Sequence, residues 1–190
     1  LCVSRRKKRL QGIVFSCLIA FLLLFLLFPQ KKSFEIDFLD VGQGDGIYLC
    51  TGGGTSMFID GGSTDVKQVG KYRILPFLKA KGVSEISYWF VSHTDTDHVS
   101  GLKEVLVSGY RVEYLVFAKA VEKEAKTKEL AELARSHGTK VLYMQAGDTV
   151  RSKRAAMRCL YPKASDKAED VNDLCLVLQF EAVSYTHLRA

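Results

Sequence analysis

The amino-acid sequence predicts an α+β fold preceded by one transmembrane helix, and three observations lead to this prediction. An uncharged, mostly apolar run extends from Leu10 to Phe28. Residues 34–59 alternate between short strand-like segments and glycine turns, which is typical of an antiparallel hairpin rather than a βαβ unit. Residues 86–91 form a bulky apolar run, typical of a buried strand, which ends at a turn with two histidines and two aspartates.

The apolar run has the length of a membrane-spanning helix. Its 19 residues can just cross a hydrocarbon core of about 30 Å. A cleaved signal peptide would end in small residues, and a buried core helix would show a polar face; this run does neither. Five basic residues at positions 5–9 precede the run. The positive-inside rule therefore places residues 1–9 in the cytoplasm and residues 31–190 on the extracytoplasmic side of a cell membrane.

Net charge gives no sign of strong nucleic-acid binding after the apolar run. The whole chain carries +6, but five of its 27 basic residues lie at positions 5–9. From residue 31 onward, 22 basic residues face 21 acidic ones, so this part is close to neutral. The five cysteines form no C-x-x-C pair, which argues against a structural zinc site and favours small apolar fillers.

The chain after the apolar run is expected to begin with a strand and a hairpin. Residues 34–39 alternate and then become apolar. Residues 40–46 combine three glycines with two acids and should turn, and residues 47–59 should form two strands joined by a glycine turn. The glycines lack the G-x-G-x-x-G spacing and no helix follows them, so a nucleotide site is not expected.

The rest of the chain is expected to alternate helices with strands. Residues 67–81 are predicted to be partly helical, since Pro76 suits a first helical turn and Gly82 a helix end. Behind the histidine turn, residues 101–107 are typical of a short helix. The later elements are expected to be a strand at 114–117, a helix at 121–137 closed by Gly138, and strands at 140–144, 157–161 and 174–180.

The turn after the buried strand carries the strongest chemical signal. His93, Asp95 and Asp97 are two residues apart and can converge on one side, and His98 can approach from the following helix. Imidazole and carboxylate groups suit Zn²⁺, and a carboxylate-rich set also admits Mn²⁺. Such a set can hold two metal ions that activate a water for hydrolysis. The alternative is a solvated turn in which Asp95 or Asp97 caps the helix, but a cap explains one aspartate and neither histidine.

Several motifs around this turn resemble a known family. The run His93-Thr-Asp-Thr-Asp-His98 resembles the H-x-H-x-D-H motif of the metallo-β-lactamase superfamily, with Asp95 in place of the second histidine. Phe58-Ile-Asp-Gly-Gly62 resembles the first motif of that superfamily. Other segments narrow the resemblance to the C-terminal domain of ComEC-type DNA-internalisation (competence) proteins, in which aspartate at that position is usual. These segments are residues 38–45, 70–76 and 171–178, the last with Cys175 where serine is usual.

This resemblance implies a metallo-β-lactamase-like αβ/βα sandwich and assigns roles to individual residues. His93 and Asp95 would hold one divalent metal ion, zinc or manganese. Asp97 and His98 would hold a second, and Asp97 would also act as the catalytic residue that orients the water. Asp60 would support the metal turn from behind. Three residues of the glycine turn belong to the family motif and have turn formation as their alternative role: Asp40, Gln43 and Asp45.

The resemblance ends at about residue 180. The family continues there with a glycine turn, an apolar strand and a T-G-D segment whose aspartate bridges the metals, whereas this chain ends in an unrelated run of ten residues. The expected parts are a basic flank and transmembrane helix at 1–30, a partial metallo-β-lactamase-like domain at 31–180, and an atypical tail at 181–190 that resembles a sequence artefact. Such a partial domain is expected to hold an incomplete metal site and to be inactive by itself.

The predicted function is that of a metal-dependent hydrolase domain in a bacterial DNA-uptake membrane protein, which cleaves DNA phosphodiesters with a metal-activated water. The expected partners are DNA at the cell surface, single-stranded or duplex, the bacterial cell membrane, and other proteins of the competence machinery. Two alternatives stay open. One is a non-catalytic domain that guides DNA at the channel mouth, and the other is a membrane-anchored metallohydrolase that acts on a small molecule.

Overall fold

The computed structural model describes residues 2–27, 34–152 and 154–182. By its internal contacts the chain divides into two compact units, Leu1–Lys31 and Lys32–Ala190. The described residues of the first unit form one helix, α1 (Cys2–Leu27), so the prediction of a helix in this region is confirmed. Among the residues that the structure describes, no helix is both long and apolar enough to cross a membrane, and the predicted membrane span therefore has no support from the structure.

The second unit is built on a six-stranded sheet with the strand order β1-β2-β3-β4-β5-β6. Its strands are β1 (Glu35–Phe38), β2 (Gly46–Cys50), β3 (Ser56–Asp60), β4 (Glu85–Phe90), β5 (Arg111–Ala118) and β6 (Lys140–Met144). The first three pair antiparallel, which confirms the predicted hairpin at the sheet edge. Strands β3 to β6 pair parallel, so each of these pairs needs a crossover connection.

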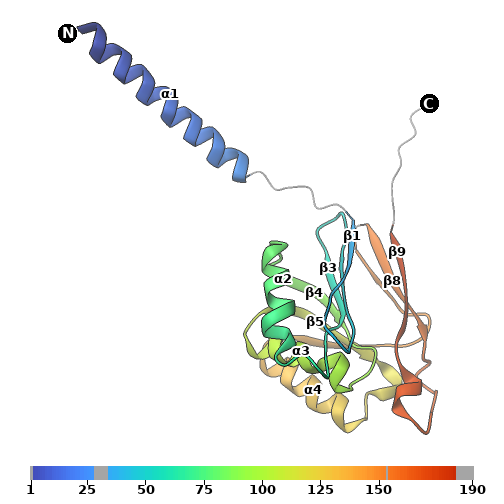
Figure 1. The fold of residues 1–190 in the computed structure, drawn as a ribbon. Helices are drawn as coiled ribbons and strands as arrows, with labels where there is room; N and C mark the ends of the chain where they lie inside the picture. The colour runs from blue at the N-terminus through green and yellow to red at the C-terminus, as the bar shows by residue number, and fades with distance from the viewer. Residues whose placement is uncertain (1, 28–33, 153, 183–190) are drawn as a thin grey trace, which may run out of the picture. The chain divides into compact units, whose positions relative to one another are not determined.

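Three helices make these crossovers and cover one face of the sheet (Figure 1). They are α2 (Leu75–Ala80), α3 (Thr96–Val107) and α4 (Ala125–Ser136). A π-helical turn at Gly70–Ile74 leads directly into α2, so the partly helical prediction for this region is confirmed. Each helix returns the chain to the start of the next parallel strand, and the loops that follow β3, β4 and β5 therefore share one edge of the sheet.

A smaller antiparallel sheet lies on the opposite face (Figure 1). It consists of β7 (Thr149–Arg151), β8 (Ala155–Tyr161) and β9 (Val177–Ala182). A 3-10 turn, η3 (Val171–Leu174), precedes β9 and brings the chain back toward the end of β4, where the N–H of Leu176 donates to the carbonyl of Ser92 at 3.1 Å.

Two apolar clusters bury the six-stranded sheet on both faces. On the helix side, Trp89 is fully buried and its ring stacks on Phe58 with centroids 4.4 Å apart. On the other side, Phe90 and Val116 belong to a cluster with Met157 of β8. Because Trp89 and Phe90 are adjacent in β4 and face opposite sides, this strand is buried on both faces, as its nearly unbroken apolar pattern predicts.

The helix after the histidine turn begins earlier than predicted. It starts at Thr96 rather than at residue 101, so Asp97 and His98 lie in its first turn. Asp95 stands at the N-cap with an extended backbone but makes no side-chain capping hydrogen bond. The sequence pattern missed this start because the residues of the first turn are polar, whereas the apolar period begins only with Val99.

Other boundaries were also wrong, each for a local reason. Helix α4 begins at Ala125, not at residue 121, because residues 119–121 form a separate 3-10 turn, η2 (Lys119–Val121). Strand β9 begins at Val177, not at residue 174, because the carboxylate of Asp170 accepts from the N–H of Asn172 and starts the η3 turn. The three-residue strand β7 was not predicted. Most of the predicted tail, residues 183–190, lies outside the described residues.

Candidate metal centre

The candidate centre lies where β4 ends and α3 begins, beside two loops that contain glycines. A Cβ atom on Gly62 would lie 2.4 Å from the carbonyl carbon of Asp97, and one on Gly44 would lie 2.5 Å from the carbonyl oxygen of the same residue. The backbone N–H of Asp45 donates to that oxygen at 3.3 Å. Only glycine allows main chains to approach this closely, so the glycines of both motifs let three backbone segments meet at the histidine turn.

Asp60 connects the end of β3 to the histidine turn. Asp60 is only 4% exposed, and its carboxylate accepts hydrogen bonds from the backbone N–H and from the hydroxyl of Ser92, both at 2.8 Å. Nδ1 of His98 lies 3.0 Å from Oδ2 of Asp60. A proton on Nδ1 shared with this carboxylate leaves Nε2 of His98 unprotonated, which is the form that binds a metal.

His93 and His98 lie side by side at this turn. Their ring centroids are 3.8 Å apart, and Nε2 of His98 lies 3.6 Å from the carboxylate of Asp97. One ligand atom from each of His93, Asp97 and His98 lies within 4.8 Å of the others. Two imidazoles and a carboxylate at such distances can share one divalent ion. The structure therefore brings together three of the four residues that were expected to bind metal.

Asp95 is not part of that group. Its Oδ2 lies 4.0 Å from Nε2 of His93, but both of its oxygens are engaged elsewhere. Oδ1 accepts from Nζ of Lys126 at 2.8 Å, and Oδ2 accepts from the side-chain amide of Asn172 at 3.1 Å. The hydrogen bond from Lys126, and then that from Asn172, hold the pKa of Asp95 below its ordinary value.

Asp45 is the residue of the glycine turn that reaches the centre. Its Oδ2 lies 3.9 Å from Nδ1 of His98, and its side chain is 66% exposed. Asp45, Asp60 and His98 form a second group whose ligand atoms lie within 4.8 Å of one another. Asp45 therefore adds negative charge near Nδ1 of His98, the nitrogen that also faces Asp60.

Asp40 and Gln43 lie in the same turn, and their recorded contacts are with residues other than the histidines. The Asp40 side chain is 85% exposed and lies 3.8 Å from a guanidinium nitrogen of Arg73. Gln43 uses its backbone N–H to bind the carboxylate of Asp65 at 2.8 Å, and its carbonyl accepts from the N–H of Thr64. The contacts of these two residues hold the loop together, which is the alternative role that the sequence left open for them.

The electrostatics of the centre favour a bound cation. Burial opposes the positive charge of His98, but the hydrogen bond to Asp60 and the charges of Asp60, Asp97 and Asp45 outweigh it and raise the pKa of His98. The carboxylates of Asp45, Asp60 and Asp97 thus surround the His98 imidazole. Mixed nitrogen and oxygen donors with this net charge fit a divalent metal ion.

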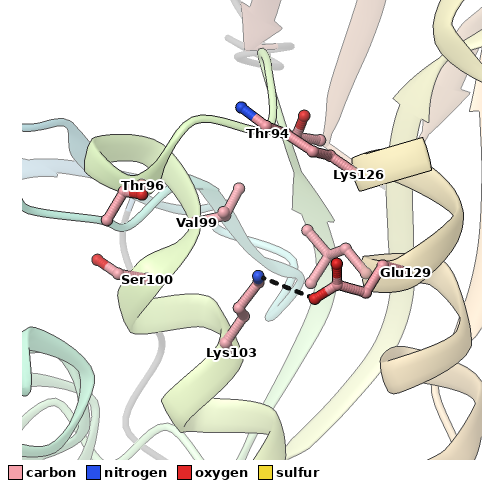
Figure 2. A pocket seen from close by; sticks show the side chains of 8 residues that line it. Thr94, Thr96, Val99, Ser100, Lys103, Lys126 and Glu129 are labelled. Carbon is pink, nitrogen blue, oxygen red and sulfur yellow. Dashed lines mark ion pairs between the residues drawn. The ribbon is translucent and has the colours of Figure 1, made fainter. Parts of the chain in front are cut away.

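Two cavities open beside the centre. One of about 240 Å³ lies between α3 and α4, where Lys103 and Glu129 form an ion pair at 3.5 Å (Figure 2). The other, of about 360 Å³, is lined by Asp95 and Asn172 among others. Thr94 and Lys126 line both cavities, so the turn and the first part of α4 form a common wall.

Sequence reasoning missed three residues that contact the predicted ligands. Ser92 stands at the start of the histidine motif that carries the family resemblance, but no contact was predicted for it. Lys126 is one of several lysines on a charged helix, and Asn172 lies in a segment that was noted only for its resemblance. The family resemblance was the available signal for two of them, since its motifs include Ser92 and Asn172, but it does not show what either residue contacts.

Two curated proteins are similar to this chain in sequence. The chain is 29% identical over 178 residues to ComE operon protein 3 of Bacillus subtilis, an alignment that covers 87% of this chain and 23% of that protein. It is 32% identical over 92 residues to Recombination protein 2 of Haemophilus influenzae, covering 47% of this chain and 12% of that protein. The chain thus spans less than a quarter of the length of either relative. No family model matches it.

A solved structure shows the fold. The class B3 di-zinc metallo-β-lactamase from an Alaskan soil metagenome superposes with a TM-score of 0.52 at 12% identity, covering 81% of this chain and 57% of that one. At this identity the likeness concerns the fold alone, and it confirms the predicted metallo-β-lactamase-like fold. The two sequence relatives confirm the resemblance to ComEC-type competence proteins.

Proposed function

We propose that this chain is the metal-dependent hydrolase domain of a DNA-uptake protein and that it cleaves DNA phosphodiester bonds. The observation that carries the proposal is the convergence of ligand atoms from His93, Asp97 and His98 within 4.8 Å at the end of a buried strand. The similarity to ComE operon protein 3 and to Recombination protein 2 supports DNA as the substrate class and the competence machinery as the partner.

In this proposal Ser92 and Asp60 orient a metal ligand, and Asp97 takes part in the reaction. Ser92 and Asp60 hold the His98 ring so that Nε2 faces Asp97. The Asp97 side chain is 35% exposed, so its carboxylate can accept a proton or a hydrogen bond from a water that enters from solvent. A divalent ion bound here supplies charge for the phosphoryl oxygens and an acidified water.

We infer a zinc or manganese ion from the donor set. Two imidazoles favour Zn²⁺, and the carboxylate of Asp97 admits Mn²⁺. The metallo-β-lactamase with the same fold is described as a di-zinc enzyme, and the family resemblance likewise implies two ions. The number of ions that this centre holds depends on Asp95, whose carboxylate already binds Lys126.

The test is DNA cleavage by the whole protein as its cell makes it, purified and supplied with Mn²⁺ or Zn²⁺. Labelled single-stranded and duplex DNA are incubated with the wild type and with the Asp97→Asn and His98→Ala variants. Each variant should lose about 100-fold or more of the cleavage rate, since each removes a metal donor or proton acceptor. His137→Ala is the matched control, because His137 is exposed at the end of α4. Unchanged cleavage by both site variants contradicts the mechanism, and DNA binding without metal-dependent cleavage points to a guiding role.

The proposed location is the bacterial cell membrane, with residues 31–190 on the extracytoplasmic side. The support is the uncharged run from Leu10 to Phe28 and the five basic residues at positions 5–9. Protease added to intact spheroplasts should then degrade the part after residue 31. Protection of that part until the cells are lysed would place it in the cytoplasm and overturn the proposed orientation.

A further inference from the structure

Asp95 is held by two side chains from distant parts of the chain. Nζ of Lys126 in α4 lies 2.8 Å from Oδ1, and the amide of Asn172 in η3 lies 3.1 Å from Oδ2. These partners are 31 and 77 residues away in sequence. These two contacts, which we call the Asp95 clamp, therefore depend on the tertiary fold. They use both carboxylate oxygens of Asp95, a residue that the family resemblance would assign to a metal.

The Lys126 ammonium occupies a position on Asp95 for which a second metal ion would have to compete. The carboxylate that it binds also faces Nε2 of His93 at 4.0 Å. A divalent ion shared by His93 and Asp95 would have to displace Lys126 from Oδ1 or lie close to its positive charge. Repulsion between like charges a few ångströms apart weakens either arrangement.

Asn172 makes the Asp95 clamp rigid from the opposite side. Its own backbone N–H donates to the carboxylate of Asp170 at 2.9 Å, which fixes the first residues of η3. Its side-chain amide can therefore hold Oδ2 of Asp95 in one place. A carboxylate that is fixed by one cation and one amide has little freedom to turn toward a metal ion.

The second group of possible ligands does not provide an alternative site. Both oxygens of Asp60 accept hydrogen bonds from Ser92, and Oδ2 also lies 3.0 Å from Nδ1 of His98. An ion bound to Asp60 and to that nitrogen would break the hydrogen bonds that orient the ring. Of the described residues, His93, Asp97 and His98 are thus the group that is ready to bind metal.

We propose that Lys126 supplies the second positive charge of this centre, so that the chain binds one divalent ion tightly, on His93, Asp97 and His98. Asp95 then acts as the anchor of Lys126 and not as a metal ligand. The inference rests on the proposed metal centre, and it differs from the two ions that the family resemblance implies.

The test counts Mn²⁺ ions bound by the whole protein, using equilibrium dialysis with elemental analysis and calorimetric titration. The wild type should bind one ion tightly. Lys126→Met should bind a second ion at least about tenfold more tightly than the wild type does, because Oδ1 of Asp95 becomes free to coordinate and the competing positive charge is removed. The double variant Lys126→Met with Asp95→Asn should lose that gain. Lys126→Arg, which keeps the charge, and Lys128→Ala, which removes an exposed lysine two residues away, should both behave as the wild type.

The Lys126 side chain is 70% exposed, so its replacement should leave the fold intact, which circular dichroism checks. Lys126→Gln serves as a second neutral variant. The inference is overturned if the wild type binds two ions tightly. It is also overturned if the wild type and both neutral variants bind the same number of ions with the same affinity. Either outcome leaves the hydrolase proposal standing. If the wild type binds one ion tightly but does not cleave DNA, the hydrolase proposal is overturned and the inference about Lys126 stands. Failure of every form to bind Mn²⁺ overturns both.

Discussion

Ser92 joins the predicted ligands to the sheet, although it is not a usual metal donor. Its hydroxyl donates to Asp60 and lies within 3.3 Å of a ring nitrogen of both His93 and His98. Its backbone N–H binds the other oxygen of Asp60, and its carbonyl accepts from the N–H of Leu176. One small residue therefore orients two imidazoles and tethers the segment that leads into β9.

Replacing Ser92 by alanine should weaken metal binding without unfolding the protein. We expect about 10- to 100-fold lower Mn²⁺ affinity, because the ligands lose the group that orients them. The free energy of unfolding should fall by about 1–3 kcal/mol, since a buried carboxylate loses a hydrogen-bond donor. Calorimetric titration and urea denaturation measure the two effects. Ser136→Ala, at an exposed position in α4, is the control, and equal Mn²⁺ affinity in the two variants would show that Ser92 has no such role.

Asp60→Asn tests the role of the negative charge next to Nδ1 of His98, and it changes the shape of the side chain little. The amide keeps one acceptor for Ser92 but loses the negative charge that faces Nδ1 of His98. We expect Mn²⁺ affinity to fall by about tenfold or more, because a neutral partner makes the imidazole a weaker ligand. Glu132→Gln makes the same chemical change at an exposed position of α4 and should leave the affinity unaltered.

The element that decides the geometry of the centre is the first turn of α3. Gly62 packs against it so closely that a Cβ would lie 2.5 Å from the backbone nitrogen of His98. The carbonyl of Gly61 accepts from the N–H of Leu102 at 3.1 Å, which extends the contact along the helix. The loop after β3 and the start of α3 thus form one packed unit, and the ligands of α3 take their positions from it.

Gly62→Ala should therefore damage both stability and metal binding. The nearest atoms are backbone atoms that cannot move without shifting α3, and forcing an extra methyl group into such packing costs about 1–3 kcal/mol. Thermal unfolding and Mn²⁺ titration should both show the loss. Gly12→Ala is the control, since a Cβ there would meet nothing within 4 Å. A Gly62→Ala protein with wild-type stability and affinity would mean that the close approach is not needed.

At the scale of the whole second unit, the centre lies where both sheets contribute. The ligands follow β4 and begin α3, whereas Asn172 and Leu176 come from the segment that enters the smaller sheet. The ring of Phe180 in β9 stacks on Phe34 next to β1, with centroids 5.4 Å apart. A metal ion bound at this junction should stabilise the unit as a whole and not only the turn.

Divalent metal should accordingly raise the midpoint of thermal unfolding. At a free Mn²⁺ concentration about 100 times the dissociation constant, binding to the folded state adds about 2.7 kcal/mol. For a domain of this size that corresponds to a shift of roughly 5–10 °C. Calorimetry should show the shift in the wild type and in His137→Ala, and a chelator should reverse it. A shift of equal size in His98→Ala would contradict binding at this centre.

Features that depend on residues close together in the chain can be predicted from the sequence. The alternating and glycine-rich pattern of residues 34–59 predicts the hairpin, because side-chain alternation and turn chemistry act locally. The bulky run at 86–91 predicts the strand buried on both faces. The histidines and aspartates of the turn are recognisable because they are neighbours in sequence and share one end of that strand.

The partner that each of those residues binds depends on contacts that form only in the folded chain. Asp95 and Asp97 look equivalent in the sequence, yet Asp97 faces His98 while Asp95 binds Lys126 and Asn172. Asp95 also stands at the N-cap of α3 without a capping hydrogen bond, because its side chain is used in these long-range contacts. The choice of partner for a carboxylate depends on which donors the fold brings within about 3 Å. No local pattern contains that information when the donors lie 31 and 77 residues away.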